Sequence, residues 1–465
     1  MRLYSTLSRE LEELPAPPGP IRMYFCGPTV YQRAHIGNAR PFVIGMWLRS
    51  WLRAQGYDAT LVHNITDVND KIYDAAPGAS AELAARATEW YLEDTGDLGL
   101  GMPDVLPKAT DAVPSIVEFI SKLVDSGHAY PVDGDVYFRV ASDPGYGRLS
   151  RQRPDQVEEQ EPNPLKEDPR DFALWKANKP GEDTAWDSPW GRGRPGWHIE
   201  CSAMAEDAFG PAFEIHGGGL DLVFPHHENE LAQSSALGHD FASIWMHNGM
   251  LDFGAEKMSK SLGNDVSIRN VLDTWGPDVV LLFFMTAHWR KPIDFGDEVL
   301  EQAKAQLEGF EDATRQISRE APQNEWARLV TVLDDDFDTP GALAVLNEWR
   351  SAGYHALVEK GLALFGIRPL RTTVLGESHL ALQASLGTSG VVAPSNVQYL
   401  GSRPPDVVFE KALLRYDARA GGDYSTADAL RVEVEDLGFR VDDLPDGYVI
   451  VPIHRQRSGT EPTSE

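Results

Sequence analysis

Two short segments of the chain carry residue types that suit phosphate chemistry. The first is His35-Ile36-Gly37-Asn38, where a loop is expected to enter a helix. A helix N-terminus offers unpaired N–H groups and partial positive charge, which favours a bound phosphate. The second is residues 257–261 (KMSKS), in which Lys257 and Lys260 form a compact cation suited to a polyphosphate leaving group. Either segment alone is more often a helix cap or a solvated loop, but the pair indicates nucleotide chemistry.

A second set of residues has the chemistry of metal ligands. The chain has only two cysteines, Cys26 and Cys201, too few for a disulfide framework. Pro225 fits the first position of a helix, which puts His226 and Glu230, four residues apart, on one helix face. Two thiolates, one imidazole and one carboxylate make a plausible zinc set. The alternative from the residues alone is two buried core cysteines and a solvated helix face.

The elements that must position these residues form a βαβ unit. We expect a strand at 21–25, a helix at 37–52 and a second strand at 59–65. This order predicts a parallel sheet with a right-handed crossover. Ligands of such sheets bind at the carboxyl ends of the strands, where Cys26 to Asn38 and Thr66 would lie.

The remainder of the chain predicts an α/β protein with added parts. A polar, proline-rich stretch before Trp190 favours an insertion into the Rossmann-like parallel-sheet domain. Apolar residues at three-and-four spacing in 299–317 and 325–354 predict a helical-bundle domain. Few charges in 372–405 suggest a linker, and two helices followed by two short strands predict a small C-terminal α+β unit.

Composition excludes several classes of protein. With 465 residues the chain is too long for one compact domain, and 42% hydrophobic residues exclude wholesale disorder. The net charge of -29 argues against a histone-like or membrane-surface polycation. We find no run of about 18 uncharged apolar residues and no signal peptide at the start. A cytosolic protein without a membrane span is therefore expected.

Taken together, the motifs resemble those of class I aminoacyl-tRNA synthetases. The glycine turn ending in Asp221 (residues 217–221, GGGLD) is similar to the family's third nucleotide contact. The resemblance is closest to the cysteinyl-tRNA synthetases, and it covers Leu3 to about Ala344 and Ala418 to about Gly447. It is carried by residues 26–31 (CGPTVY), 35–40 (HIGNAR), 194–204 (RPGWHIECSAM), 215–219 (IHGGG), 224–230 (FPHHENE) and the lysine loop.

This resemblance implies a role for each candidate residue. The residues it implies for catalysis are His35, Asn38, Lys257 and Lys260. For ATP it implies these four together with Thr29, Gly37, Gly219 and Asp221. It places the substrate cysteine near Gly27, Thr66, Trp197 and His216, and one zinc ion on Cys26, Cys201, His226 and Glu230. The implied substrates are L-cysteine, ATP with Mg²⁺, and tRNA(Cys), handled by a monomer.

The resemblance also implies how the chain divides into domains. It implies a catalytic domain at 1–112 and 193–262, a connective insertion at 113–192, a stem-contact region at 263–300, a tRNA-binding bundle at 301–371, a linker-like segment at 372–405 and a small C-terminal domain at 406–465. Residues 411–465 hold 7 Lys/Arg against 11 Asp/Glu, so basic residues that contact tRNA must be grouped locally or lie in the bundle.

A zinc ion would solve a problem of selectivity, because cysteine and serine are nearly equal in volume. A pocket that reads shape separates such molecules by only about 1–3 kcal/mol. Zinc binds a thiolate far better than a neutral hydroxyl, so no proofreading domain is needed. Two alternatives stay open: a ligase that couples activated cysteine to an amino sugar, and a non-catalytic cysteine sensor.

Overall fold

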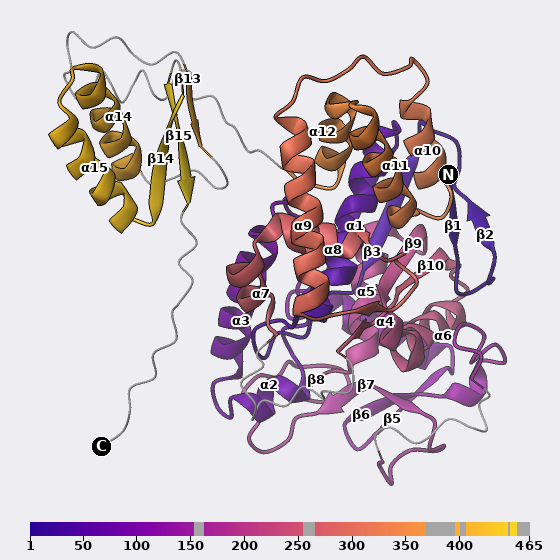
Figure 1. Ribbon diagram of the computed structural model, residues 1–465. Helices are drawn as coiled ribbons and strands as arrows, with labels where there is room; N and C mark the ends of the chain where they lie inside the picture. The colour runs from indigo at the N-terminus through magenta and orange to yellow at the C-terminus, as the bar shows by residue number, and fades with distance from the viewer. Residues whose placement is uncertain (153–161, 254–265, 369–395, 400–405, 445–446, 453–465) are drawn as a thin grey trace. The chain divides into compact units, whose positions relative to one another are not determined.

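A computed structural model describes residues 1–152, 162–253, 266–368, 396–399, 406–444 and 447–452 (Figure 1). The chain forms two compact units, Met1–Ile367 and Arg368–Glu465. No helix among the described residues is long and apolar enough to cross a membrane.

The first unit is built on a parallel sheet of four strands in the order β10-β9-β3-β4. The strands are β3 (Pro20–Phe25), β4 (Asp58–His63), β9 (Ala212–Gly219) and β10 (Phe241–Asn248). Helix α1 (Ile36–Ala54) joins β3 to β4 and packs on the sheet through its buried apolar residues. Gly45 of α1 lets the helix approach closely, because a Cβ there would lie 3.3 Å from the Phe25 ring. The prediction of a Rossmann-like parallel sheet is thus confirmed.

A second, antiparallel sheet lies between β4 and β9 in the sequence (Figure 1). Its strand order is β5-β6-β7-β8, and every neighbouring pair is antiparallel. The strands are β5 (Ala129–Val132), β6 (Asp135–Phe138), β7 (Phe172–Ala177) and β8 (Gly193–Pro195), preceded by α2 (Asp70–Ala75), α3 (Ser80–Gly96) and α4 (Val113–Asp125). The chain then returns to the parallel sheet through α5 (Trp197–Phe209), and α6 (Glu228–Ala236) connects β9 to β10.

The rest of the first unit is mainly helical. Its helices are α7 (Ile268–Trp275), α8 (Pro277–Met285), α9 (Asp297–Thr314), α10 (Trp326–Leu333), α11 (Thr339–Ala352) and α12 (His355–Leu364). Short paired strands complete it: β1 (Arg2–Tyr4) with β2 (Leu11–Glu13), and β11 (Leu251–Asp252) with β12 (Ile293–Asp294). The helical pattern over 325–354 is interrupted, because Asp336 and Phe337 have positive φ angles and Asp338 caps α11 by accepting from Gly341 N–H at 3.0 Å.

The second unit has its own small core. Helices α14 (Asp406–Ala420) and α15 (Tyr424–Asp436) accompany a sheet of β13 (Asn396–Tyr399), β15 (Gly447–Pro452) and β14 (Phe439–Leu444), in that order. Val408, Phe409, Val434 and Ile450 are buried together. The two predicted helices and two strands are present. The described part of the segment predicted as linker-like at 372–405, Asn396–Tyr399, pairs with β15.

Candidate metal and nucleotide site

A cluster of metal-ligand side chains meets at the carboxyl end of the parallel sheet. Cys26 directly follows β3, and Cys201 lies in α5 with its Sγ 3.8 Å from that of Cys26. The turn before α6 brings His226 Nε2 to 3.6 Å and His227 Nε2 to 3.3 Å from the Cys26 sulfur. Glu230 Oε1 lies 3.1 Å from His226 Nε2 and 3.8 Å from Cys26 Sγ. All five side chains are buried.

These donors fit a divalent cation. Cys26, His226, His227 and Glu230 each offer one ligand atom, and these atoms all lie within 4.8 Å of one another. Burial raises the pKa of the Cys26 thiol and of the Glu230 carboxyl well above their usual values. Burial also lowers the pKa of His226 and His227 well below the usual value, so both rings are neutral and able to bind a metal. A dication would offset the cost of ionising the thiol and the carboxyl at this depth.

A layer of histidines surrounds the cluster, and the sequence reading missed most of it. His198 Nδ1 lies 3.0 Å from Nδ1 of His226, and His247 Nε2 lies 2.7 Å from Nδ1 of His227. His247 is held in turn by the Thr6 hydroxyl, 2.8 Å from its Nδ1. Ligating histidines in proteins commonly have their second nitrogen bonded in this way. The sequence contained one indication of this layer, because His227 is adjacent to the predicted ligand His226.

Two residues expected to contact the substrate cysteine lie against this cluster. The Trp197 ring stacks on His226, with ring centroids 4.3 Å apart. His216 Nε2 lies 2.8 Å from Glu230 Oε2, and burial lowers the pKa of His216 to about 3. A neutral His216 has one N–H with which it can hold the Glu230 carboxylate.

The other two residues expected to contact cysteine, Gly27 and Thr66, are joined through Asn64. Gly27 N–H donates to Asn64 Oδ1 at 2.9 Å, and Asn64 Nδ2 donates to the Thr66 hydroxyl at 3.3 Å. A Cβ on Gly27 would lie 1.7 Å from the Asn64 carbonyl oxygen, so this position requires glycine. The sequence reading missed Asn64, which is fully buried.

The first phosphate motif forms the N-terminal cap of α1. His35 Nδ1 accepts from Gly37 N–H at 3.0 Å, and Asn38 Oδ1 accepts from His35 N–H at 3.2 Å. His35 also packs edge-on against Phe253, with ring centroids 5.1 Å apart. These contacts orient the ring at a helix end suited to phosphate.

The other expected ATP contacts lie at neighbouring strand ends or outside the described residues. Thr29 pairs with Thr66 by backbone hydrogen bonding. Gly219 is the last residue of β9, and Asp221 lies two residues beyond it. Leu220 and Met250 are 49% and 47% exposed, just beyond the paired ends of β9 and β10, and they offer an apolar surface that the sequence reading missed. The second phosphate motif, with Lys257 and Lys260, lies outside the described residues.

Comparison with known proteins matches residues 13–305 to the family model of the tRNA synthetases class I (C) catalytic domain. The chain is 41% identical over 475 residues to a protein of Geobacillus thermodenitrificans named Cysteine--tRNA ligase, covering 96% of this chain and 98% of that protein. The protein of the same name from Parvibaculum lavamentivorans is 42% identical over 467 residues, covering 96% and 97%.

Among solved structures, the fold is similar to Mycobacterium tuberculosis methionyl-tRNA synthetase bound by methionyl-adenylate. The TM-score is 0.54 at 14% identity, covering 76% of this chain and 88% of that one. At this identity the likeness concerns the fold alone. The family model and the full-length relatives establish more, and the chain belongs to the cysteine--tRNA ligase family of class I tRNA synthetases.

Proposed function

We propose that this chain activates L-cysteine with ATP to form cysteinyl-adenylate and then transfers the cysteinyl group to tRNA(Cys). The observation that carries the proposal is the buried cluster of thiol, imidazole and carboxylate groups beside Gly27 and Thr66, at the end of the sheet where such folds bind ligands. Relatives that align with 96% of the chain carry the name Cysteine--tRNA ligase, which favours this acceptor over an amino sugar.

The metal in the cluster would be one zinc ion held by Cys26, Cys201, His226 and Glu230. Two sulfurs, a nitrogen and an oxygen are the donors that zinc prefers. When bound, zinc would coordinate the thiolate of the substrate and so favour cysteine over serine. Trp197 and His216 would help to enclose the substrate, because they touch His226 and Glu230.

Activation needs no nucleophile from the protein. A carboxylate oxygen of cysteine forms a bond to the α-phosphorus of ATP, and the bond to the pyrophosphate oxygen breaks with its electron pair leaving on pyrophosphate. His35, Asn38 and the N-terminus of α1 would hold the phosphates, with Gly37, Thr29, Gly219 and Asp221 lining the rest of the nucleotide site. Lys257 and Lys260 would neutralise the departing pyrophosphate, whose Mg²⁺ arrives with ATP.

The second step would engage other parts of the chain. We assign the stem contact to 263–300, and further tRNA binding to the bundle at 301–371 and the small domain at 406–465. A monomer in the cytoplasm, where tRNA is charged, completes the proposal.

The test uses the purified full-length chain. Cysteine-dependent ATP–pyrophosphate exchange and formation of cysteinyl-tRNA are expected, with serine giving neither. An amino-sugar acceptor is offered in parallel. Cysteine transfer to the sugar alone would assign the chain to the ligase alternative, and cysteine binding without exchange would make it a sensor.

A further inference from the structure

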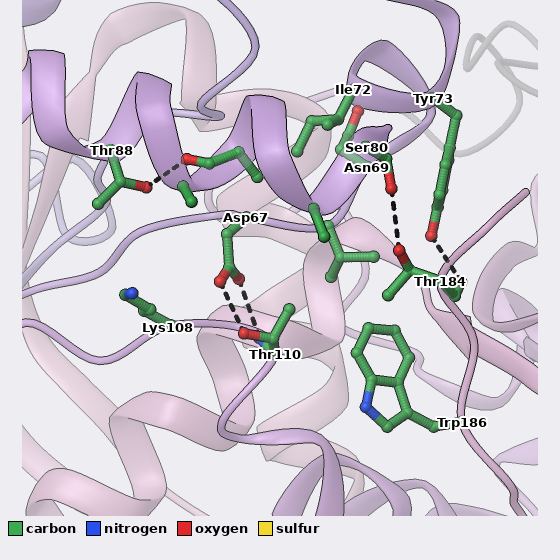
Figure 2. Close-up of a pocket in the computed structure, with 14 residues that line it drawn as sticks. Asp67, Asn69, Ile72, Tyr73, Ser80, Thr88, Lys108, Thr110, Thr184 and Trp186 are labelled. Atoms are coloured by element: carbon green, nitrogen blue, oxygen red, sulfur yellow. Dashed lines mark hydrogen bonds between the residues drawn. The ribbon is translucent and has the colours of Figure 1, made fainter. Parts of the chain in front are cut away.

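A cavity of about 320 Å³ lies beside the candidate site, and none of the roles above uses it. Asp67, the residue that follows Thr66, lines one end of this cavity. The cavity is enclosed by α2, by α3, by the segment before α4 and by the loop before β8 (Figure 2). Its lining residues include Asp67, Ile72, Ala84, Lys108, Thr110 and Trp186.

One end of the cavity is polar and carries both signs of charge. Figure 2 shows the Asp67 carboxylate turned toward Thr110, with Lys108 on the same side. Asp67 Oδ1 accepts from Thr110 N–H at 2.9 Å and Oδ2 from the Thr110 hydroxyl at 2.6 Å, and the backbone N–H of Asp67 also donates to this carboxylate. Since a carboxylate has about four acceptor sites, one remains for another donor. Nζ of Lys108 makes no hydrogen bond to any residue that the structure describes. The end therefore offers an acceptor and a donor close together.

The walls of the cavity are mostly apolar. Ala81, Ala84 and Ala85 line it from one face of α3, where side chains without bulk leave room. Figure 2 shows Trp186 across the cavity from Ser80 and Thr88 of α3. The Trp186 indole is half-buried, so part of its ring surface is available for stacking. A planar ring with polar atoms on one edge would fit between these walls.

We propose that this cavity receives a nucleobase from the single-stranded 3′ end of tRNA, with the exocyclic amino group of that base donating to Asp67. The inference rests on the proposed function, since the terminal ribose must reach the adenylate beside Thr66. Cytosine and adenine both present an amino donor next to a ring-nitrogen acceptor, which Asp67 and Lys108 complement. Uracil and hypoxanthine carry an oxo group instead and would face the carboxylate unfavourably. Proteins commonly read unstacked RNA bases by such edge contacts and by stacking on aromatic rings.

The test replaces one base at a time in the CCA end of tRNA(Cys), with uridine for either cytidine or inosine for the terminal adenosine. We expect one of these three changes to raise the KM for tRNA by about tenfold or more with the unmodified chain. Asp67→Asn should reduce that penalty to about twofold or less, because an amide can donate to the oxo group. The position that responds identifies which of the three bases occupies the cavity.

Asp74→Asn is the matched control, because it makes the same change at an exposed position of α2, and it should keep the full penalty. Trp186→Phe should bind tRNA more tightly than Trp186→Ala, since only the phenyl ring can stack. Equal base discrimination by the unmodified chain and Asp67→Asn, or none in either, would overturn the proposal. Cysteine-dependent ATP–pyrophosphate exchange needs no tRNA, so its loss in the unmodified chain would count against the proposed function, whereas its retention confines a failure to the cavity.

Discussion

Nε2 of His227 lies 3.3 Å from Sγ of Cys26, nearer than Nε2 of His226 at 3.6 Å. The second ring nitrogen of His227 also has the shorter hydrogen bond. Nδ1 of His227 lies 2.7 Å from Nε2 of His247, which is itself hydrogen-bonded to the Thr6 hydroxyl, whereas Nδ1 of His226 lies 3.0 Å from His198. Cys26 therefore faces two imidazoles that differ in their second hydrogen-bond partner. Substitution of His226 and of His227, one at a time, would therefore show how much each imidazole contributes to metal binding.

Substitutions in the cluster should lower metal binding to different degrees. We expect Cys26→Ala and Cys201→Ala to lose bound zinc, since each removes a thiolate. His227→Ala should weaken zinc binding by about 10- to 100-fold, because His227 is not among the four assigned ligands but its Nε2 lies 3.3 Å from the sulfur of one of them, Cys26. Elemental analysis and competition with a chelator measure both effects. His239→Ala is the control, because that ring pairs with Glu206 away from the cluster. Full zinc content in Cys26→Ala would contradict the assigned ligands.

Gly27→Ala should destabilise the protein and impair cysteine binding. The added Cβ would lie 1.7 Å from the Asn64 carbonyl oxygen, so the ends of β3 and β4 must separate. Overpacking of this kind typically costs about 1–3 kcal/mol in the free energy of unfolding. Chemical denaturation and the KM for cysteine in pyrophosphate exchange test this. Gly19→Ala is the matched control, because its nearest neighbour would be 3.8 Å away, and it should have no such effect.

Lys260→Ala should slow activation while leaving cysteine binding nearly intact. The lysine is assigned to charge that develops on pyrophosphate, and loss of one such donor commonly costs about 10²–10³ in kcat. Pyrophosphate exchange measures the rate, and the KM for cysteine measures ground-state binding. An unchanged exchange rate would remove Lys260 from the mechanism.

Part of the acid sensitivity of the fold should come from His63. Burial lowers the pKa of His63 to about 4, and its Nε2 lies 2.6 Å from the Tyr91 hydroxyl. The unfolded chain, with a histidine pKa of about 6.5, binds a proton below that pH that the folded chain does not. The free energy of unfolding should therefore fall as the pH drops from about 6.5 to about 4, by up to about 1.4 kcal/mol per pH unit from this group.

His63→Gln should remove that part of the slope, because glutamine does not titrate. Urea unfolding of both proteins between pH 7 and pH 4.5 measures the difference. The other buried histidines contribute equally to both curves, so the comparison isolates His63. Parallel stability curves would contradict the assignment.

Local patterns in the sequence were sufficient to predict the βαβ unit. A buried strand, a helix-starting turn and a second strand are each determined by a few adjacent residues, and β3, α1 and β4 lie within a few residues of the predicted ranges. The break at Asp336 and the pairing of β13 were missed, because an interruption in a helical pattern and a strand partner are not local properties.

The candidate site depends on contacts between residues far apart in the sequence. Cys26 and Cys201 are brought to 3.8 Å because β9 pairs beside β3 and α5 returns the chain to that edge. Residue types and family resemblance could name Cys26 and Cys201 as candidate ligands, but they could not predict the second imidazole near Cys26 or the cavity beside Thr66. Those features arise from the packing of α6, α3 and the insertion around the strand ends, where burial also decides which groups remain neutral.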